Sequence, residues 1–228
     1  MGKVVAVIPV REGSQRVKHK NFQPFAQGPS LLERKINHLK SANCFDDIYV
    51  SSDSTLAQEI AKKQGVSFLQ RSSIMCSSEV KWADVIKHVA ETVPGQPEIA
   101  WCHTTSPLFK RYKEALEAYK KNIPHYNSLL TVTPCQEFLL KENGRPLNYQ
   151  WGYWHDYSQD LEKLYSVTGA LFIASKENII KWSYLIGTKP LYFHTSKIEA
   201  IDIDEVEDFK MAEYLLPFQE NFKHQEEG

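Results

Sequence analysis

The sequence lacks a long apolar run, an excess of charge of either sign and closely spaced cysteines. Its longest uninterrupted apolar run, Val4 to Val10, is far shorter than the ~20 residues that a membrane-spanning helix needs. The run also lies too close to Met1 to be the core of a cleaved signal peptide. We therefore expect a cytoplasmic protein that does not associate with membranes.

The charge balance excludes a second class of partner. Lys and Arg total 27 against 28 Asp and Glu, which gives a net charge of −1. A protein that holds nucleic acid through its overall positive charge is therefore not expected. Any anionic ligand must be held by a local cluster of basic side chains.

Cysteine and histidine spacing argues against a zinc or redox site. Cys44, Cys76, Cys102 and Cys135 are scattered without a Cys-x-x-Cys pair, and the eight His form no His-Glu-x-x-His motif. We therefore expect the cysteines to be buried, unreactive thiols with no role in metal binding or redox chemistry.

The pattern of strands and helices predicts a single three-layer α/β domain over residues 1–228. Short β-branched runs alternate with helices of about ten residues, which is typical of a mostly parallel sheet covered on both faces. The expected strands are Val4–Ile8, Ile48–Val50, Val66–Leu69, Ile99–Cys102, Ser128–Val132, Ala170–Ile173 and Leu191–Phe193. The expected helices run from Ser30, opened by a capping box with Glu33, to about Asn43, from Ser54 to Gly65, over Trp82–Val93, and from Glu205 to about Leu216.

An insertion interrupts this alternation between about Gln136 and Tyr165. It is polar and aromatic with weak periodicity, and its aromatic residues are Tyr149, Trp151, Tyr153, Trp154 and Tyr157. Exposed Trp and Tyr are enriched in protein interfaces, so we expect the insertion to pair two copies of the chain. Stacking on an acceptor substrate is the alternative.

A basic loop follows the first strand and is the strongest candidate for a phosphate site. The loop contains four basic residues and only one acidic residue, Glu12; the basic residues are Arg11, Arg16, Lys18 and Lys20. The Gly-Ser pair that follows Glu12 allows a tight turn. In an open parallel sheet, ligands bind beyond the carboxyl ends of the strands, where positive charge and backbone N–H groups can meet a polyphosphate. The segment has neither the Walker A nor the Gly-x-Gly-x-x-Gly form. An ordinary solvated loop is the alternative.

Two carboxylates near the C-terminus form a candidate magnesium site. Asp202 and Asp204 are two residues apart on an extended segment, so their side chains point to the same face. Two carboxylates there repel one another unless a cation lies between them, and Mg²⁺ prefers such oxygen ligands. Asp204 alone has a second interpretation as the N-cap of the final helix.

Four segments resemble, in order, the signatures of the acylneuraminate (CMP-sialic acid synthetase) family of acidic-sugar cytidylyltransferases. The N-terminal signature, roughly Ile-Pro-Ala-Arg-x-Gly-Ser-Lys-x-x-Pro-x-Lys-Asn, is matched at Ile8, Pro9, Arg11, Gly13, Ser14, Lys20 and Asn21. The other matches are Val50–Asp53, Thr105–Leu108, and the Ile-Asp-Ile-Asp segment Ile201–Asp204 followed by Glu207 and Asp208. Together they cover nearly the whole chain.

The resemblance implies a nucleotidyltransferase fold like that of the nucleotide-diphospho-sugar transferases, and a homodimer that pairs through the insertion. It implies transfer of CMP from CTP to an acidic 2-keto sugar, with release of pyrophosphate. In the family's pattern, Arg11, Ser14, Lys20 and Asn21 match residues that hold the CTP phosphates and ribose. Arg71 falls where the family keeps an arginine near cytosine, although it could equally be a surface residue. Asp202 and Asp204 match the carboxylates that bind Mg²⁺.

Three departures bear on the predicted site. The lysine of the family's loop is Gln15 here, with Arg16 beside it as a candidate third phosphate ligand next to Arg11 and Lys20. The family's Arg-Pro-Asn-Gly segment is replaced by Ser166–Gly169, which loses an arginine associated with the acidic sugar. The glutamine before the Thr-Ser-Pro loop is His103, a candidate nucleotide contact whose imidazole could also act as a general base.

Two other functions remain open on the sequence alone. Asp202-Ile203-Asp204 has the Asp-x-Asp form of metal-dependent glycosyltransferases, although such motifs usually end a central strand in mid-chain. Gln15 and the missing acceptor arginine would also fit a nucleotide-binding module without catalytic activity.

Overall fold

The computed structural model describes residues 2–13 and 16–219, in which seven strands form one sheet. The strands are β1 (Val4–Pro9), β2 (Asp47–Ser52), β3 (Ser67–Gln70), β4 (Glu98–Trp101), β5 (Ser128–Cys135), β6 (Leu164–Ser175) and β7 (Pro190–His194). Their order across the sheet is β3-β2-β1-β4-β6-β5-β7. Among the described strands, only β6 runs antiparallel to its neighbours, β4 and β5. The prediction of a mostly parallel sheet is confirmed.

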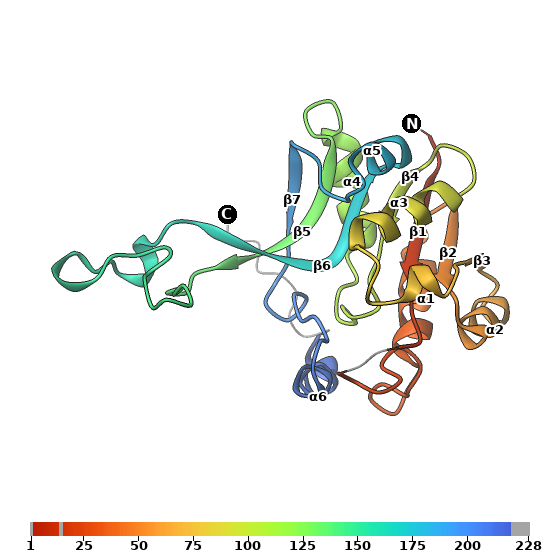
Figure 1. The fold of residues 1–228 in the computed structure, drawn as a ribbon, viewed down its shortest axis with the longest axis horizontal. Coiled ribbons are helices and arrows are strands. Elements are labelled where there is room, and N and C mark those ends of the chain that lie inside the picture. The colour runs from red at the N-terminus through yellow and green to blue at the C-terminus, as the bar shows by residue number, and fades with distance from the viewer. Residues whose placement is uncertain (1, 14–15, 220–228) are drawn as a thin grey trace.

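Helices cover both faces of this sheet, as the three-layer prediction requires (Figure 1). Side chains of α1, α2 and α4 pack in the cluster on one face, and side chains of α3 and α5 pack in the cluster on the other. The helices are α1 (Leu31–Ala42), α2 (Thr55–Lys63), α3 (Trp82–Thr92), α4 (Tyr112–Asn122), α5 (Lys176–Trp182) and α6 (Val206–Leu215), with 3₁₀ turns at Ile74–Cys76, Gly152–Trp154, Ser158–Asp160 and Leu216–Phe218. None of the described helices is both long and apolar enough to cross a bilayer.

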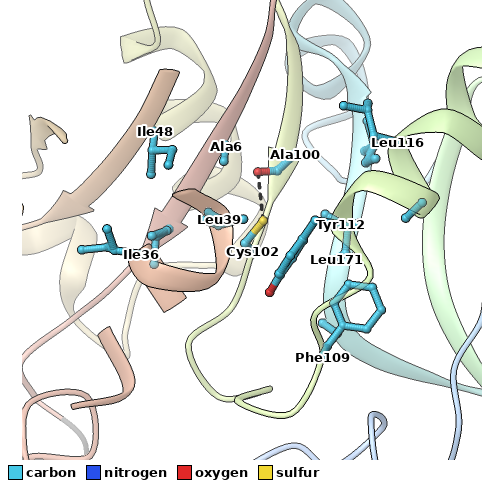
Figure 2. Close-up of a cluster of buried hydrophobic side chains, with 14 of the residues drawn as sticks. Ala6, Ile36, Leu39, Ile48, Ala100, Cys102, Phe109, Tyr112, Leu116 and Leu171 are labelled. Atoms are coloured by element: carbon cyan, nitrogen blue, oxygen red, sulfur yellow. Dashed lines mark hydrogen bonds between the residues drawn. The ribbon is translucent and has the colours of Figure 1, made fainter. Parts of the chain in front are cut away.

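The apolar run of β1 is buried on both sides, which explains its lack of polar alternation. Val4, Ala6 and Ile8 contribute to the cluster under α1, α2 and α4, whereas Val5 and Val7 contribute to the opposite one. Figure 2 shows the first cluster, in which Ile36 and Leu39 of α1 and Tyr112 of α4 close over the central strands.

The predicted helix signals have their expected effects. The Ser30 side chain accepts the Glu33 N–H at 3.3 Å, and the Glu33 carboxylate accepts the Ser30 N–H at 3.0 Å, so the capping box opens α1. Ser54 caps α2, and Gly65 follows that helix with a φ of 65°.

Two helices, α4 and α5, have no counterpart in the sequence-based prediction. The buried residues of α4 are Tyr112, Ala115, Leu116 and Tyr119, an i, i+3, i+4, i+7 pattern that does mark one face of a helix. The two tyrosines make that face look polar, although both rings are fully buried. The helix α5 has seven residues, too few to show a clear period.

Strands β5 and β6 extend beyond the sheet and carry residues 136–163 away from the body, and we refer to these residues as the arm (Figure 1). The predicted insertion, from about Gln136 to Tyr165, begins at the same residue as the arm and ends two residues after it. Within it, the Phe138 ring stacks on His155 at a centroid distance of 4.9 Å. Other rings face solvent, and Tyr153 is 92% exposed. A few aromatic rings therefore pack against one another within the arm, while several other aromatic side chains are exposed to solvent.

A smaller apolar cluster packs the loop between β1 and α1 against α6 and the segment before it. Val17 and Phe25 of the basic loop pack with Ile203 and with Phe209 of α6, and the Phe25 and Phe209 rings meet edge to face at 5.4 Å. The Ala26 N–H also donates to the Glu213 carboxylate at 2.6 Å. This packing places the Asp202–Asp204 segment beside the basic loop.

Candidate active site

A cavity of about 570 Å³ opens at the carboxyl ends of the parallel strands. Its wall is formed by the segments that follow β1, β3 and β4, together with Asp204. The strand pattern predicts ligand binding at the loops after Val10, Val50 and Cys102, and the first and third do line the cavity. The loop after Val50 does not. Its place is taken by the segment from Arg71 to Val85, which follows β3 and leads into α3.

The basic loop reaches this cavity with three charged side chains, Arg11, Arg16 and Lys20. The Lys20 ammonium is mostly buried; it donates to the Ile203 carbonyl at 2.5 Å and lies 3.9 Å from the Asp204 carboxylate. Burial lowers the pKa of Lys20, and the nearby Asp204 charge opposes that shift. Ser14, another predicted phosphate ligand, and Gln15 lie outside the described residues.

Asn21 is buried and connects the loops on either side of the cavity. Its Nδ2 group donates to the Arg11 carbonyl at 3.2 Å, and its Oδ1 atom accepts the Thr104 hydroxyl at 2.7 Å. Asn21 therefore fixes the backbone that presents Arg11. A direct contact of Asn21 with nucleotide stays a prediction.

Arg16 bridges the basic loop to the acidic segment near the C-terminus. One guanidinium nitrogen lies 2.9 Å from the Asp204 carboxylate and the other lies 3.0 Å from Glu205. These groups are about half exposed, so their attraction is weakened by solvent and an incoming anion can compete for the guanidinium.

The N-cap interpretation of Asp204 is wrong. The helix α6 begins at Val206 with Glu205 as its N-cap, and the Asp204 and Glu205 N–H groups both donate to the Asp208 carboxylate, at 3.0 and 2.7 Å. The side chain of Asp204 instead points to Arg16 and lines the cavity. Its carboxylate is thus available to a ligand.

Asp202 lies on the same extended segment, next to the loop that follows β4. Burial raises the pKa of Asp202, and the neighbouring Asp204 charge adds to this, while a hydrogen bond from the Thr105 side chain acts against it. Gly169, with a φ of 71°, lies next to it. A Cβ atom there would stand 3.4 Å from His103 Nδ1 and 3.8 Å from Asp202 Oδ2. Both side chains therefore lie beside Gly169, and the positive φ, not a lack of space, favours glycine there.

The donor set fits magnesium shared with a phosphate ligand. Within residues 2–13 and 16–219, no three His, Cys, Asp or Glu side chains gather into a group that could hold a metal ion. Mg²⁺ commonly takes one or two carboxylates and completes its octahedron with phosphate oxygens and water. Asp202 and Asp204 match that requirement, whereas a structural zinc ion needs four protein ligands.

Arg71 is almost completely buried, so the interpretation as a surface residue is wrong. Its Nη2 group donates to the Val10 carbonyl at 2.5 Å, and its Nε group donates to Cys76 Sγ at 2.9 Å. Among the described residues, the remaining Nη1 group has no hydrogen-bond partner, and Arg71 lines the cavity. The guanidinium is thus fixed at two points with donors left for a ligand.

His103 lines the cavity, but its geometry does not favour a general base. The Trp101 indole N–H donates to its Nε2 atom at 3.0 Å, and the ring also hydrogen-bonds to the Gly169 backbone. Burial lowers the pKa of His103 to about 4. A neutral imidazole engaged at both nitrogens has no free lone pair for a substrate proton. A nucleotide contact through the ring stays a prediction.

The cavity also contains residues that have no place in the sequence-based site. The segment between β3 and α3 contributes the apolar side chains of Met75, Cys76, Val80 and Trp82 to the lining, together with two serines, Ser77 and Ser78. A sequence signal was present, since this stretch follows a strand whose carboxyl end lies at the same edge of the sheet.

A buried lysine supports the loop that follows β4. Lys35 of α1 donates to the Ser106 carbonyl at 3.0 Å and to the Tyr112 hydroxyl at 2.6 Å. Burial lowers its pKa from 10.5 to about 8. The ammonium therefore ties the Thr104–Pro107 turn to the helical layer at a cost in desolvation.

Lys35→Met should remove part of the pH dependence of stability. Because the pKa of Lys35 is about 8 in the folded chain and near 10.5 unfolded, the unfolded chain binds more protons between these values. The free energy of unfolding should thus rise with pH above about 8, by up to ~1.4 kcal/mol per pH unit from this group. Urea unfolding of the wild type, Lys35→Met and the exposed-lysine control Lys40→Met at several pH values measures this. Parallel profiles for wild type and Lys35→Met would contradict it.

A sequence profile described as Cytidylyltransferase matches residues 5–215. The N-acylneuraminate cytidylyltransferase of Streptococcus agalactiae serotype V is 27% identical over 221 residues, which cover 91% of this chain and 52% of that protein. The pseudaminic acid cytidylyltransferase of Campylobacter jejuni is 26% identical over 225 residues, which cover 93% of this chain and 96% of that protein. The chain thus spans about half the length of the first relative and nearly all of the second.

Solved structures support the fold. CMP:2-keto-3-deoxy-manno-octonic acid synthetase in complex with CTP superimposes with a TM-score of 0.69 over 95% of this chain and 99% of that one, at 11% identity. At that identity the likeness concerns the fold alone, and it agrees with the predicted nucleotidyltransferase architecture. With the family profile matched over nearly the whole of the described chain, the resemblance seen in the four sequence motifs is confirmed. The chain belongs to the cytidylyltransferase family.

Proposed function

We propose that this chain transfers CMP from CTP to an acidic 2-keto sugar of the sialic-acid type and releases pyrophosphate. The observation that carries the proposal is the arrangement of charge in one cavity. Arg16 and Lys20 lie 2.9 and 3.9 Å from the Asp204 carboxylate, and Arg11 and the buried Arg71 line the same cavity. The matched relatives are named for cytidylyl transfer to N-acylneuraminate and pseudaminic acid.

The proposed reaction is an in-line displacement. A hydroxyl oxygen of the acceptor forms a bond to the α-phosphorus of CTP, and the bond from that phosphorus to the oxygen bridging to the β-phosphate breaks. Pyrophosphate leaves with the electron pair, and the hydroxyl proton passes to water. Such transfers depend mainly on positioning and on neutralising charge. Arg11, Arg16 and Lys20 would hold the departing phosphates.

Asp202 and Asp204 would hold Mg²⁺. When bound, the ion neutralises negative charge on the phosphate oxygens and orients them. The Arg16–Asp204 ion pair implies that the nucleotide binds before the ion, because a triphosphate would compete with Asp204 for the Arg16 guanidinium. Once Arg16 turns to phosphate, the Asp204 carboxylate loses its partner at 2.9 Å and becomes free to bind a cation.

The acceptor site departs from the family's pattern at Ser166–Gly169, where the arginine associated with the acidic sugar is missing. Thr168 in this segment is buried, and its hydroxyl donates to Thr131 Oγ1 at 2.8 Å, so it stabilises the sheet. A positively charged partner for the acceptor carboxylate would then have to come from outside this segment, which contains no basic residue.

The proposal includes a homodimer formed through the arm and a cytoplasmic location. The arm's uncovered rings, including Trp154 at 71% exposure, support an interface. The four cysteines are free thiols, which suits a reducing compartment.

A nucleotide panel tests the base assignment. Pyrophosphate release is measured with CTP, UTP, GTP and ATP at equal concentration, with Mg²⁺ and a mixture of 2-keto sugar acids. CTP should be preferred by at least about tenfold, since losing one well-made polar contact to the base costs ~1.4 kcal/mol or more. Equal rates with CTP and UTP would contradict cytidylyl transfer as the specific activity.

A further inference from the structure

An exposed indole lies in the wall of the cavity. Trp82 is the first residue of α3, and 46% of its surface is exposed. It lines the cavity between Val80 and Val85. Burying an exposed aromatic ring under a ligand removes apolar surface from water, which stabilises the complex.

Aromatic neighbours hold this ring in place. Trp82 meets the Trp101 ring edge to face at a centroid distance of 5.9 Å, and it meets His103 at 5.9 Å with a tilt of 49°. Trp101 is completely buried, and its indole N–H is bonded to His103. The ring of Trp82 thus packs on these neighbours, and the residue is partly exposed and belongs to the lining of the cavity.

The lining of the cavity combines two kinds of side chain. Its charged residues are Arg11, Arg16 and Lys20 of the basic loop, Arg71 and Asp204, whereas most of its large apolar residues, Trp82 among them, come from the segment that leads from β3 into α3. A nucleoside triphosphate has the same division, since its phosphates are charged and its base is planar and weakly polar. If the basic loop binds the phosphates, the apolar side chains between β3 and α3 remain as the surface for the base, and Arg71, which is bonded to Cys76 of that segment, has donors left for its edge.

We propose that Trp82 is a nucleotide-binding residue whose indole stacks on the base. The inference rests on the proposed function for the site, but it does not depend on which base is bound, because every nucleobase has a π-face. Trp82 would supply affinity, and Arg71 would supply the polar contacts that choose among bases. Trp82 belongs neither to the basic loop nor to the Asp202–Asp204 segment, so it should affect binding of the nucleotide more than the bond-making step.

Binding of CTP and of inorganic pyrophosphate to four proteins tests this by isothermal titration calorimetry. The proteins are the wild type, Trp82→Ala, Trp82→Phe and the control Tyr184→Ala, whose side chain is also 46% exposed but does not line the cavity. Trp82→Ala should weaken CTP binding about tenfold, as expected for loss of base stacking. Trp82→Phe should recover most of that loss, and Tyr184→Ala should bind CTP like the wild type. The affinity for pyrophosphate should be the same in all four.

Steady-state rates give a second readout. Trp82→Ala should raise KM for CTP about tenfold while kcat stays within about twofold, because stacking stabilises the bound nucleotide and the transition state alike. Wild-type affinity for CTP in Trp82→Ala would overturn the inference and leave the proposed function standing, and so would equal losses for CTP and pyrophosphate. A wild-type chain that binds no nucleoside triphosphate would overturn both.

Discussion

Asp202→Asn and Asp204→Asn should each lower turnover at limiting magnesium by at least about tenfold, which is ~1.4 kcal/mol of transition-state stabilisation. Each change removes one of the two negative charges proposed to hold Mg²⁺, while the size of the side chain stays the same. Pyrophosphate release at saturating CTP measures the effect across a magnesium titration. Excess magnesium should recover part of the lost activity, since a weakened site fills at a higher concentration of the ion.

Folding stability separates this effect from structural damage. Partial desolvation and the neighbouring Asp204 charge raise the pKa of Asp202, although the residue keeps an exposed surface, so Asp202→Asn should be about as stable as the wild type. Asp204→Asn loses a half-exposed ion pair with Arg16 and the longer one with Lys20, and ion pairs of a half-exposed carboxylate stabilise little. Glu207→Gln, an exposed acid on α6, is the matched control and should keep full activity. A fully active Asp204→Asn variant at limiting magnesium would remove the metal site from the mechanism.

The arm should determine the oligomeric state. Sedimentation should give the wild type twice the 26.3 kDa mass of one chain. A variant with serine at Trp151, Tyr153, Trp154 and Tyr157 should sediment as a monomer. These side chains are exposed on the described chain, and the loss of a few buried aromatic anchors commonly costs ~2 kcal/mol or more each in an interface. Serine at Tyr184 and Tyr214, exposed aromatics outside the arm, is the control and should leave the dimer intact.

The same variant decides between the two interpretations of the aromatic insertion. If the rings bind the acceptor sugar and not a second copy, the arm variant keeps the wild-type mass and instead raises KM for the acceptor. A wild type that sediments as a monomer at micromolar concentration would contradict the proposed homodimer directly.

The features that follow from local sequence are the ones that could be predicted. The both-sided burial of β1 is visible in its unbroken apolar run, and the capping box at Ser30 marks the start of α1. The basic loop and the Asp202–Asp204 pair are also local patterns. Their clustered charge predicts binding of a ligand of opposite sign, and in the fold Arg16 of the loop pairs with Asp204 of that segment.

Pairings between distant residues could not be predicted. Arg16 and Asp204 are 188 residues apart in the chain, and only the packing of α6 on the basic loop brings them together. The engagement of both His103 nitrogens depends on Trp101 and on the backbone of β6, so the histidine's lack of a free lone pair is not readable from its loop. The place of the segment after β3 at the carboxyl edge of the sheet can be read from the sequence, but the contacts of Trp82 with Trp101 and His103 cannot.

The central claim is tested most directly by following the α-phosphate of CTP. The purified chain is incubated with CTP labelled at the α-phosphorus, Mg²⁺ and a panel of 2-keto sugar acids. We predict that at least one acid accepts labelled CMP with release of one pyrophosphate per CMP transferred, and that no pyrophosphate forms without acceptor. Tight binding of CTP without transfer to any acid would contradict the account, as would transfer of sugar from a nucleotide sugar without release of pyrophosphate.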